Sequence, residues 1–142
     1  MTHKAETILD AVVTAVTGLA STGSNVERGR AYAVSAVPSL SVFMGEDQIE
    51  NELSIGYYDR VLEVFVEAHV ATTGDTEQDL NQIRAEVFAA LRADHTLGGA
   101  AIEIKPDTES RPEIQGETDT PHALQQLLYL VKYRHSTTSA EV

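Results

Sequence analysis

The residues best suited to chemistry are four carboxylates in the short stretch 45–56: Glu46, Asp47, Glu50 and Glu52. Clustered carboxylate oxygens could hold a hard cation, and a small metal-dependent hydrolase could use such a site. The glycine-centred spacing of a calcium loop is missing, however, and no histidine lies close by in the sequence. A solvated acidic loop is the simpler interpretation, and the sequence predicts no metal site.

The other potentially reactive residues lack the spacing that known chemistries require. The five histidines are dispersed and form no HExxH or other paired pattern. No serine lies in a G-x-S-x-G elbow. Gly18 and Gly23 are not followed by the Gly-Lys-Ser/Thr of a phosphate-binding loop. We therefore expect no catalytic residue, no cofactor and no enzymatic activity.

Two arginines stand out because the chain is otherwise acidic. Arg28 and Arg30 are two residues apart, so on a strand their side chains would share one face. They could pair with exposed carboxylates of the same chain, which would stabilise it little. Alternatively, they could pair with an acidic patch on a partner, where charge mainly fixes register and selects the partner. The sequence leaves both readings open.

Several other side chains are candidates for contacts with partners. Tyr57 and Tyr58 precede a long predicted strand and could anchor an interface, whereas core packing is an equal alternative for Tyr129 and Tyr133. Charged residues in polar stretches complete the set. The interface candidates are Arg28, Arg30, Glu46, Asp47, Tyr57, Tyr58, Arg111 and Glu113.

Two long segments with alternating apolar residues predict the strands that must position these groups. Residues 58–70 place Leu62, Val64, Val66 and Ala68 on one face, which is the period-two pattern of a half-buried strand. Residues 123–134 place Leu127, Tyr129, Val131 and Tyr133 on one face and further leucines on the other. Apolar residues on both faces predict a central strand or one that meets a partner.

Two amphipathic helices are predicted, at residues 3–19 and 76–92. The second has a stripe of Leu80, Ile83, Val87 and Leu91, and Asp75 with Gln78 forms a capping box at its start. Shorter strands are expected at 26–33, 39–44 and 101–104, with the acidic stretch 45–56 as a hairpin connection. Residues 105–121 are rich in Pro, Thr, Asp and Glu, which predicts a long mobile loop or a β-arm.

The order of these elements predicts an α+β fold. We expect a mostly antiparallel sheet of four to five strands with two helices on one face, because each helix has one apolar stripe to bury. A length of 142 residues suits a single domain, 1–142, with the mobile loop or arm at about 105–121.

The amino-acid composition argues against nucleic acids and membranes as partners. The chain has 22 acidic and 10 basic residues and a formal net charge of −12, whereas proteins that bind nucleic acids present a basic face. It has no cysteine, which is compatible with a reducing compartment. The start lacks the apolar core of a signal peptide, and no window approaches the roughly 20 apolar residues of a bilayer span. We expect a soluble protein that binds neither nucleic acid nor membrane.

A family resemblance spans residues from about 4 to 135. The sequence reads TILDAVVTAVTGL, VPSLSVFMGED, DRVLEVFVEAHV, QDLNQIRAEVFAAL, an LGG break and a closing ALQQLLYLVKYR. This order resembles the tail terminator proteins of long-tailed phages, the minor tail protein U-like family. The proline-led strand and the tyrosine-rich last strand are its most specific parts, and neither is a catalytic signature.

The resemblance implies a structural virion protein assembled in the host cytoplasm. Such a subunit would close into a six-fold ring at the head-proximal end of the tail tube, stop tube polymerisation and present a surface to the head-tail connector. Six copies would carry six times −12, or −72, formal charges. A negative lumen would repel duplex phosphates, so DNA could pass through without specific binding.

Two alternatives remain open at the level of sequence. A head-tail connector or neck protein, which completes the head, would have a similar length and a small α+β fold. A metal-dependent hydrolase built on the acidic stretch is the more distant alternative.

Overall fold

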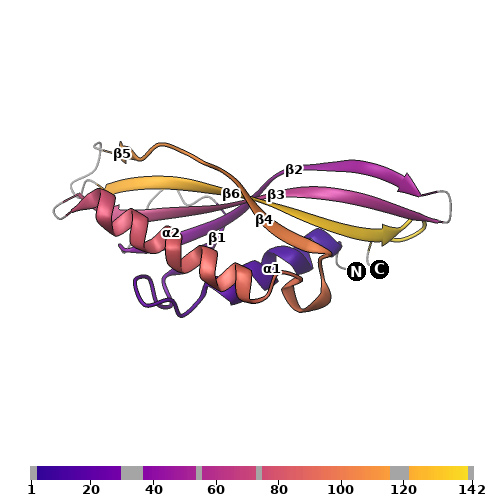
Figure 1. Ribbon diagram of the computed structural model, residues 1–142, viewed down its shortest axis with the longest axis horizontal. Helices are drawn as coiled ribbons and strands as arrows, with labels where there is room; N and C mark the ends of the chain where they lie inside the picture. The colour runs from indigo at the N-terminus through magenta and orange to yellow at the C-terminus, as the bar shows by residue number, and fades with distance from the viewer. Residues whose placement is uncertain (1–2, 30–36, 54–55, 73–74, 116–121, 141–142) are drawn as a thin grey trace.

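A computed structural model describes residues 3–29, 37–53, 56–72, 75–115 and 122–140 of the chain (Figure 1). The elements are α1 (Lys4–Val16), β1 (Val26–Arg28), β2 (Ser39–Leu53), β3 (Tyr57–Ala71), α2 (Thr76–Ala93), the 3-10 turn η1 (Leu97–Gly99), β4 (Glu103–Glu109), β5 (Glu113–Gln115) and β6 (His122–Ser136).

The strands form one mixed sheet in the order β1-β2-β3-β6-β4, with β5 also paired to β6. The β1–β2 pair is parallel and the other pairs are antiparallel. The predicted α+β class is therefore confirmed. The sheet has six strands, however, because β5 adds one more strand than the four to five expected.

The sheet is much longer than the helices that cover it. Strands β2, β3 and β6 have 15 residues each, which corresponds to about 50 Å of extended chain. Helices α1 and α2 have 13 and 18 residues, or about 20 Å and 27 Å. At the right-hand end of Figure 1 the strands β2, β3 and β6 therefore continue past both helices.

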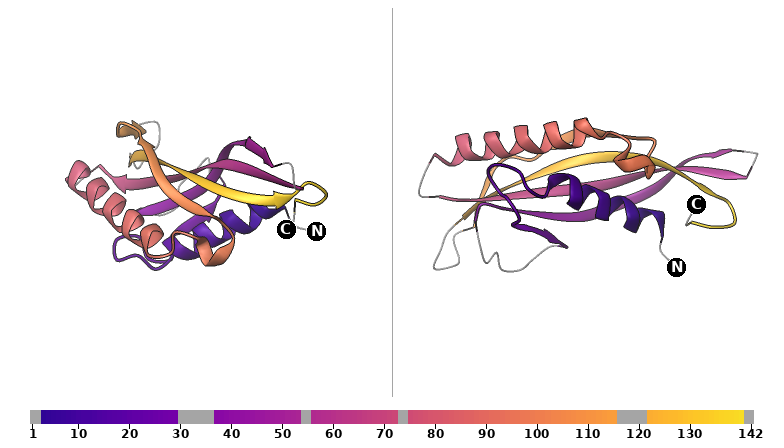
Figure 2. Two further views of the ribbon diagram at one scale, coloured as in Figure 1. Left: turned by 45° about the vertical axis from the view of Figure 1, so that its right-hand side comes forward. Right: turned by 90° about the horizontal axis from the view of Figure 1, so that it is seen from below.

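Both helices lie on the same side of the sheet, and the core lies between the two layers (Figures 1 and 2). The predicted inward residues of β3 and β6 face each other there, with Val64 opposite Tyr129 and Val66 opposite Leu127. These four side chains are at most 2% exposed. Burying a side chain of this size contributes about 1.5–3 kcal/mol, so this layer accounts for much of the stability.

The helices begin where the sequence predicts. Asp75 Oδ1 accepts a hydrogen bond from the backbone N–H of Gln78, which confirms the cap of α2. The stripe of Leu80, Ile83, Val87 and Leu91 is buried as expected. Helix α1 starts with His3, whose Nδ1 accepts from the N–H of Ala5. No helix among the described residues is long and apolar enough to cross a membrane.

Two of the expected connections are strands instead. The acidic stretch predicted as a hairpin connection continues β2 as far as Leu53. Residues 105–109 and 113–115 of the expected mobile loop or β-arm lie in strands β4 and β5, which pair with β6, and Ser110 between them exchanges hydrogen bonds with the backbone of Gln126. Charged residues are common in edge strands, because ladder hydrogen bonds need no apolar side chain. Residues 30–33 of the predicted first strand and 116–121 lie outside the described part.

Candidate functional site

The acidic stretch is divided between the two faces of the sheet by a β-bulge. The register of β2 on β3 shifts between Met44 and Asp47, where the N–H of Glu46 donates to Glu63 Oε1 at 2.9 Å. A Cβ on Gly45 would lie 2.7 Å from the ring of Phe65, so only glycine fits there without displacement. The extra residue exchanges the faces of the side chains that follow it, as far as a second register shift between Ile49 and Asn51.

As a result, Asp47 points to the helix side of the sheet. Its Oδ2 accepts the phenolic hydrogen of Tyr133 at 2.6 Å, and its Oδ1 lies 3.8 Å from Arg60 Nη1. The Asp47 side chain is only 14% exposed. The prediction that Asp47 lies in a solvated loop was therefore wrong, because the bulge makes this carboxylate an internal acceptor.

The remaining carboxylates do not converge on a cation site. Glu46 Oε2 accepts from Gln48, and Glu50 lies 3.4 Å from Lys132 Nζ. The side chain of Glu52 is outside the described set. Within the described part of the chain, no group of three or more His, Asp or Glu residues is placed to hold a metal ion. The arrangement gives the hydrolase hypothesis no support.

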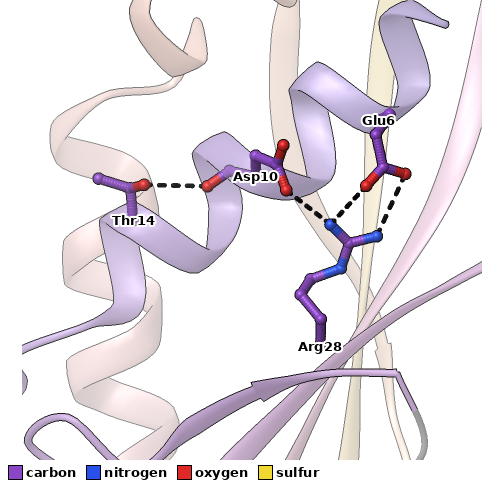
Figure 3. Close-up of polar contacts among 4 residues, drawn as sticks. All are labelled: Glu6, Asp10, Thr14 and Arg28. Carbon is purple, nitrogen blue, oxygen red and sulfur yellow. Dashed lines mark hydrogen bonds and ion pairs between the residues drawn. The ribbon is translucent and has the colours of Figure 1, made fainter. Parts of the chain in front are cut away.

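Arg28 forms ion pairs within its own chain, which is one of the two possibilities that the sequence left open. Its guanidinium bridges Glu6 and Asp10 of α1, with Nη1 2.9 Å from Glu6 Oε1 and 2.7 Å from Asp10 Oδ1 (Figure 3). The hydrogen bond from Arg28 lowers the pKa of Glu6 and raises that of Arg28 itself. The ion pairs fasten β1 to α1. Arg30 lies outside the described residues.

Tyr57 and Tyr58 have different surroundings. Tyr57 is 47% exposed at the start of β3, so it remains a candidate anchor. Tyr58 is half-buried, and its ring lies 5.6 Å from that of His135. His135 in turn accepts from Arg60 Nε at 2.7 Å. Of the pair, only Tyr57 is well placed to contact another molecule.

Arg111 and Glu113 lie on the surface beside the last strand. Both are exposed, and Glu113 begins β5 opposite Leu124 of β6. They remain candidates for contact. Their neighbour Ile114, which is not among the interface candidates, is an apolar surface residue that is 73% exposed.

A buried polar pair on the far face of the sheet was also missed. Glu67 and His69 are each 3% exposed, with His69 Nε2 3.1 Å from Glu67 Oε1. Gln126 donates to the other oxygen of Glu67 at 2.9 Å, and the ring of His122 lies 5.4 Å from that of His69. Because Glu67 and His69 are two residues apart on a strand, the sequence predicts that their side chains share one face. Nothing in the sequence indicates that this face is buried.

Beyond this pair, the far face is a shallow and mostly acidic depression. Two adjoining hollows, of about 340 and 190 Å³, share Val61, Leu130 and Glu50. Their other lining residues are Glu46, Gln48, Glu63, Glu103, Lys105, Asp107 and Lys132. The floor of the depression is apolar and its rim is charged. The described side chains that line it do not converge as catalytic groups would.

Large exposed apolar side chains gather near the two opposite margins of the sheet. Met44 (45% exposed) and Ile49 (52%) lie on β2, and we call them the β2 patch. On the β4 side, Phe88 is 45% exposed beside a hollow of about 390 Å³. We call this the α2–β4 hollow, lined by Asn81, Arg84, Ala85, Phe88 and Glu109.

No protein-family model matches the chain, and no curated protein matches its sequence. Function is therefore inferred from the fold and from these surfaces.

Proposed function

We propose that the protein is a tail terminator of a long-tailed phage. In this proposal, copies of the chain close into a ring on the head-proximal end of the tail tube, end its polymerisation and provide the surface that the head-tail connector joins. Its partners would be other copies of itself, the tail-tube protein and the connector, in the virion tail.

The observation that carries the proposal is a pair of unlike surfaces at opposite margins of one sheet, each with an exposed apolar side chain. The β2 patch and the α2–β4 hollow are separated by the strands β3 and β6. Contacts between two unlike surfaces repeat from copy to copy, and they close into a ring when the rotation between copies permits. A subunit that caps a tube needs this kind of contact and no reaction centre.

Two further features favour the proposal. The element order, with a helix before a long hairpin and a helix before the long last strand, is the order that carries the family resemblance. The formal charge of −12 per copy would make a ring acidic overall, and a negative lumen would favour passage of DNA without adhesion.

Electron microscopy of particles made without this protein tests the proposal. Tails of uncontrolled length would support termination, because tube growth would then lack its stop. Tails of normal length beside unjoined heads would refute it and favour a neck protein. Restoring the intact chain from a plasmid provides the control.

A further inference from the structure

We propose that the far face of the sheet, opposite α1 and α2, is a docking surface for a basic amphipathic helix of a different protein. Both helices lie on the other side of the sheet (Figure 2), and no helix among the described residues covers the far face. The proposed function assigns no contact to this face, so the docking surface and the proposed function can be tested separately.

The centre of the far face is a strip of apolar side chains. Phe43, Phe65 and Leu128 are neighbours on three adjacent strands, and the two phenyl rings lie 5.3 Å apart. Val61 and Leu130 continue the strip into the two adjoining hollows. All five residues are half-buried. Apolar surface that still contacts water is stabilised when another apolar surface covers it.

Carboxylates dominate the rim of this apolar strip. Five carboxylates and two lysines line the two hollows, a net formal charge of −3. Within the described part of the chain only one of the five, Glu50, forms an ion pair, with Lys132 Nζ at 3.4 Å. A complementary surface is therefore apolar in its centre and flanked by Lys or Arg, and such complementarity orients a partner and selects it. The five carboxylates are Glu46, Glu50, Glu63, Glu103 and Asp107.

The dimensions of the surface suit a short helix. From Val61 to Phe65 the strip runs about 13 Å along β3, and the four strands β2, β3, β6 and β4 are about 14 Å across. A helix of three turns is about 16 Å long. An extended segment would instead need a strand edge, where main-chain hydrogen bonds give affinity, whereas this face offers only side chains.

A second copy of this chain does not complement the far face. Neither described helix has a basic outer face: the exposed charged residues are Glu6 and Asp10 on α1 and Glu77, Asp79 and Arg92 on α2. Two far faces brought together would oppose their carboxylate rims, and like charges across an interface are unfavourable. The docked helix therefore belongs to a different protein.

A designed peptide tests the surface directly. The probe has about 14 residues, with Leu repeated at helical spacing and Lys at the other positions. We expect saturable binding that weakens as salt is added. One control peptide has Glu in place of Lys, and another has Leu and Lys in strict alternation, which favours a strand. Both should bind at least several-fold more weakly.

Paired substitutions show whether the rim attracts the peptide. Glu103→Gln together with Asp107→Asn removes two rim carboxylates and should weaken binding several-fold. Glu77→Gln together with Asp79→Asn is the matched control, because it removes the same charge from the exposed first turn of α2. This control should leave binding unchanged. Circular dichroism confirms that each variant is folded.

The apolar strip is tested by Leu130→Ala, which removes part of the floor of both hollows and should also weaken binding several-fold. Phe88→Ala is the control, since Phe88 is an exposed apolar residue of α2 on the other side of the sheet. NMR amide shifts on addition of the peptide should change around the hollows and not along α1 or α2.

Several results would overturn the inference. Equal losses in the two paired variants would mean that total charge, and not this face, attracts the peptide. Equal or tighter binding of the alternating peptide would mean that a strand edge is the site. Self-association that Glu103→Gln with Asp107→Asn abolishes would mean that a second copy occupies the face. Absence of peptide binding, with tube growth still stopped, would refute the docking surface and leave the proposed function standing.

Discussion

Tyr133 of β6 donates its phenolic hydrogen to Asp47 of β2, at 2.6 Å, across the intervening strand β3. The two side chains meet only because the bulge at Gly45 and Glu46 turns Asp47 towards the helix side. Tyr133 is fully buried. The bulge therefore allows a side-chain hydrogen bond to link β2 with β6 across β3.

Replacement of this tyrosine should be costly. Tyr133→Phe leaves the mostly buried Asp47 carboxylate without its hydroxyl donor, and hydrogen bonds to charged groups contribute about 1.5–3 kcal/mol. Urea unfolding should show a loss of that size. Tyr129→Phe is the control, because the Tyr129 hydroxyl is buried with no partner in the described structure. An equal loss in both variants would contradict the role given to Asp47.

The same two tyrosines predict sensitivity to alkaline pH. Burial raises the pKa of Tyr129 from 10.0 to about 12, and burial together with Asp47 raises that of Tyr133 further. A raised pKa means that the folded state holds the proton more tightly than the unfolded state. The stabilising contribution is complete below pH 10 and is lost as pH rises through the folded pKa. Thermal midpoints should fall above pH 10, and Tyr129→Phe should reduce that fall.

Gly45→Ala should destabilise the bulge. The new methyl group would lie 2.7 Å from the Phe65 ring and 2.8 Å from Glu63 Oε1, so the ring or the Glu46–Glu63 hydrogen bond must give way. Overpacking of this kind costs about 1–3 kcal/mol. In a Phe65→Leu background the cost should shrink. A neutral Gly45→Ala in the natural background would mean that the bulge adapts freely.

Arg28→Ala should change the titration of one carboxyl group and little else. Without the guanidinium, the pKa of Glu6 should return towards its ordinary value of 4.5. The lowered pKa stabilises the fold above that value, and this contribution disappears as pH falls. The effect on stability should be small, because the pair is exposed. NMR titration of the Glu6 carboxyl measures the shift, and an unchanged titration would remove Arg28 as its cause.

The parts predicted well from sequence share one physical cause. Residues 62–68 of β3 and the stripe of α2 follow a periodic pattern that burial imposes, so their elements and inward faces could be predicted. The extension of β2 to Leu53 could not, because a bulge and backbone pairing require no apolar pattern.

The candidate contact residues were harder to predict for the same reason. Asp47 is acidic in a polar stretch, and nothing in its neighbours signals the distant Tyr133. Arg28 meets Glu6 and Asp10 only after β1 has docked beside α1. Conversely, Phe88 directly follows Val87 of the predicted stripe, but the hollow beside it depends on how α2 lies against β4.

The length of tail tubes assembled in vitro with and without this protein decides whether the chain ends tube growth. Purified chain is added to polymerising tube protein of the same phage, and the tubes are measured by electron microscopy. The account predicts that elongation stops and that a ring lies at one end of each tube. Continued elongation with uncapped ends, in the presence of folded protein, would contradict it.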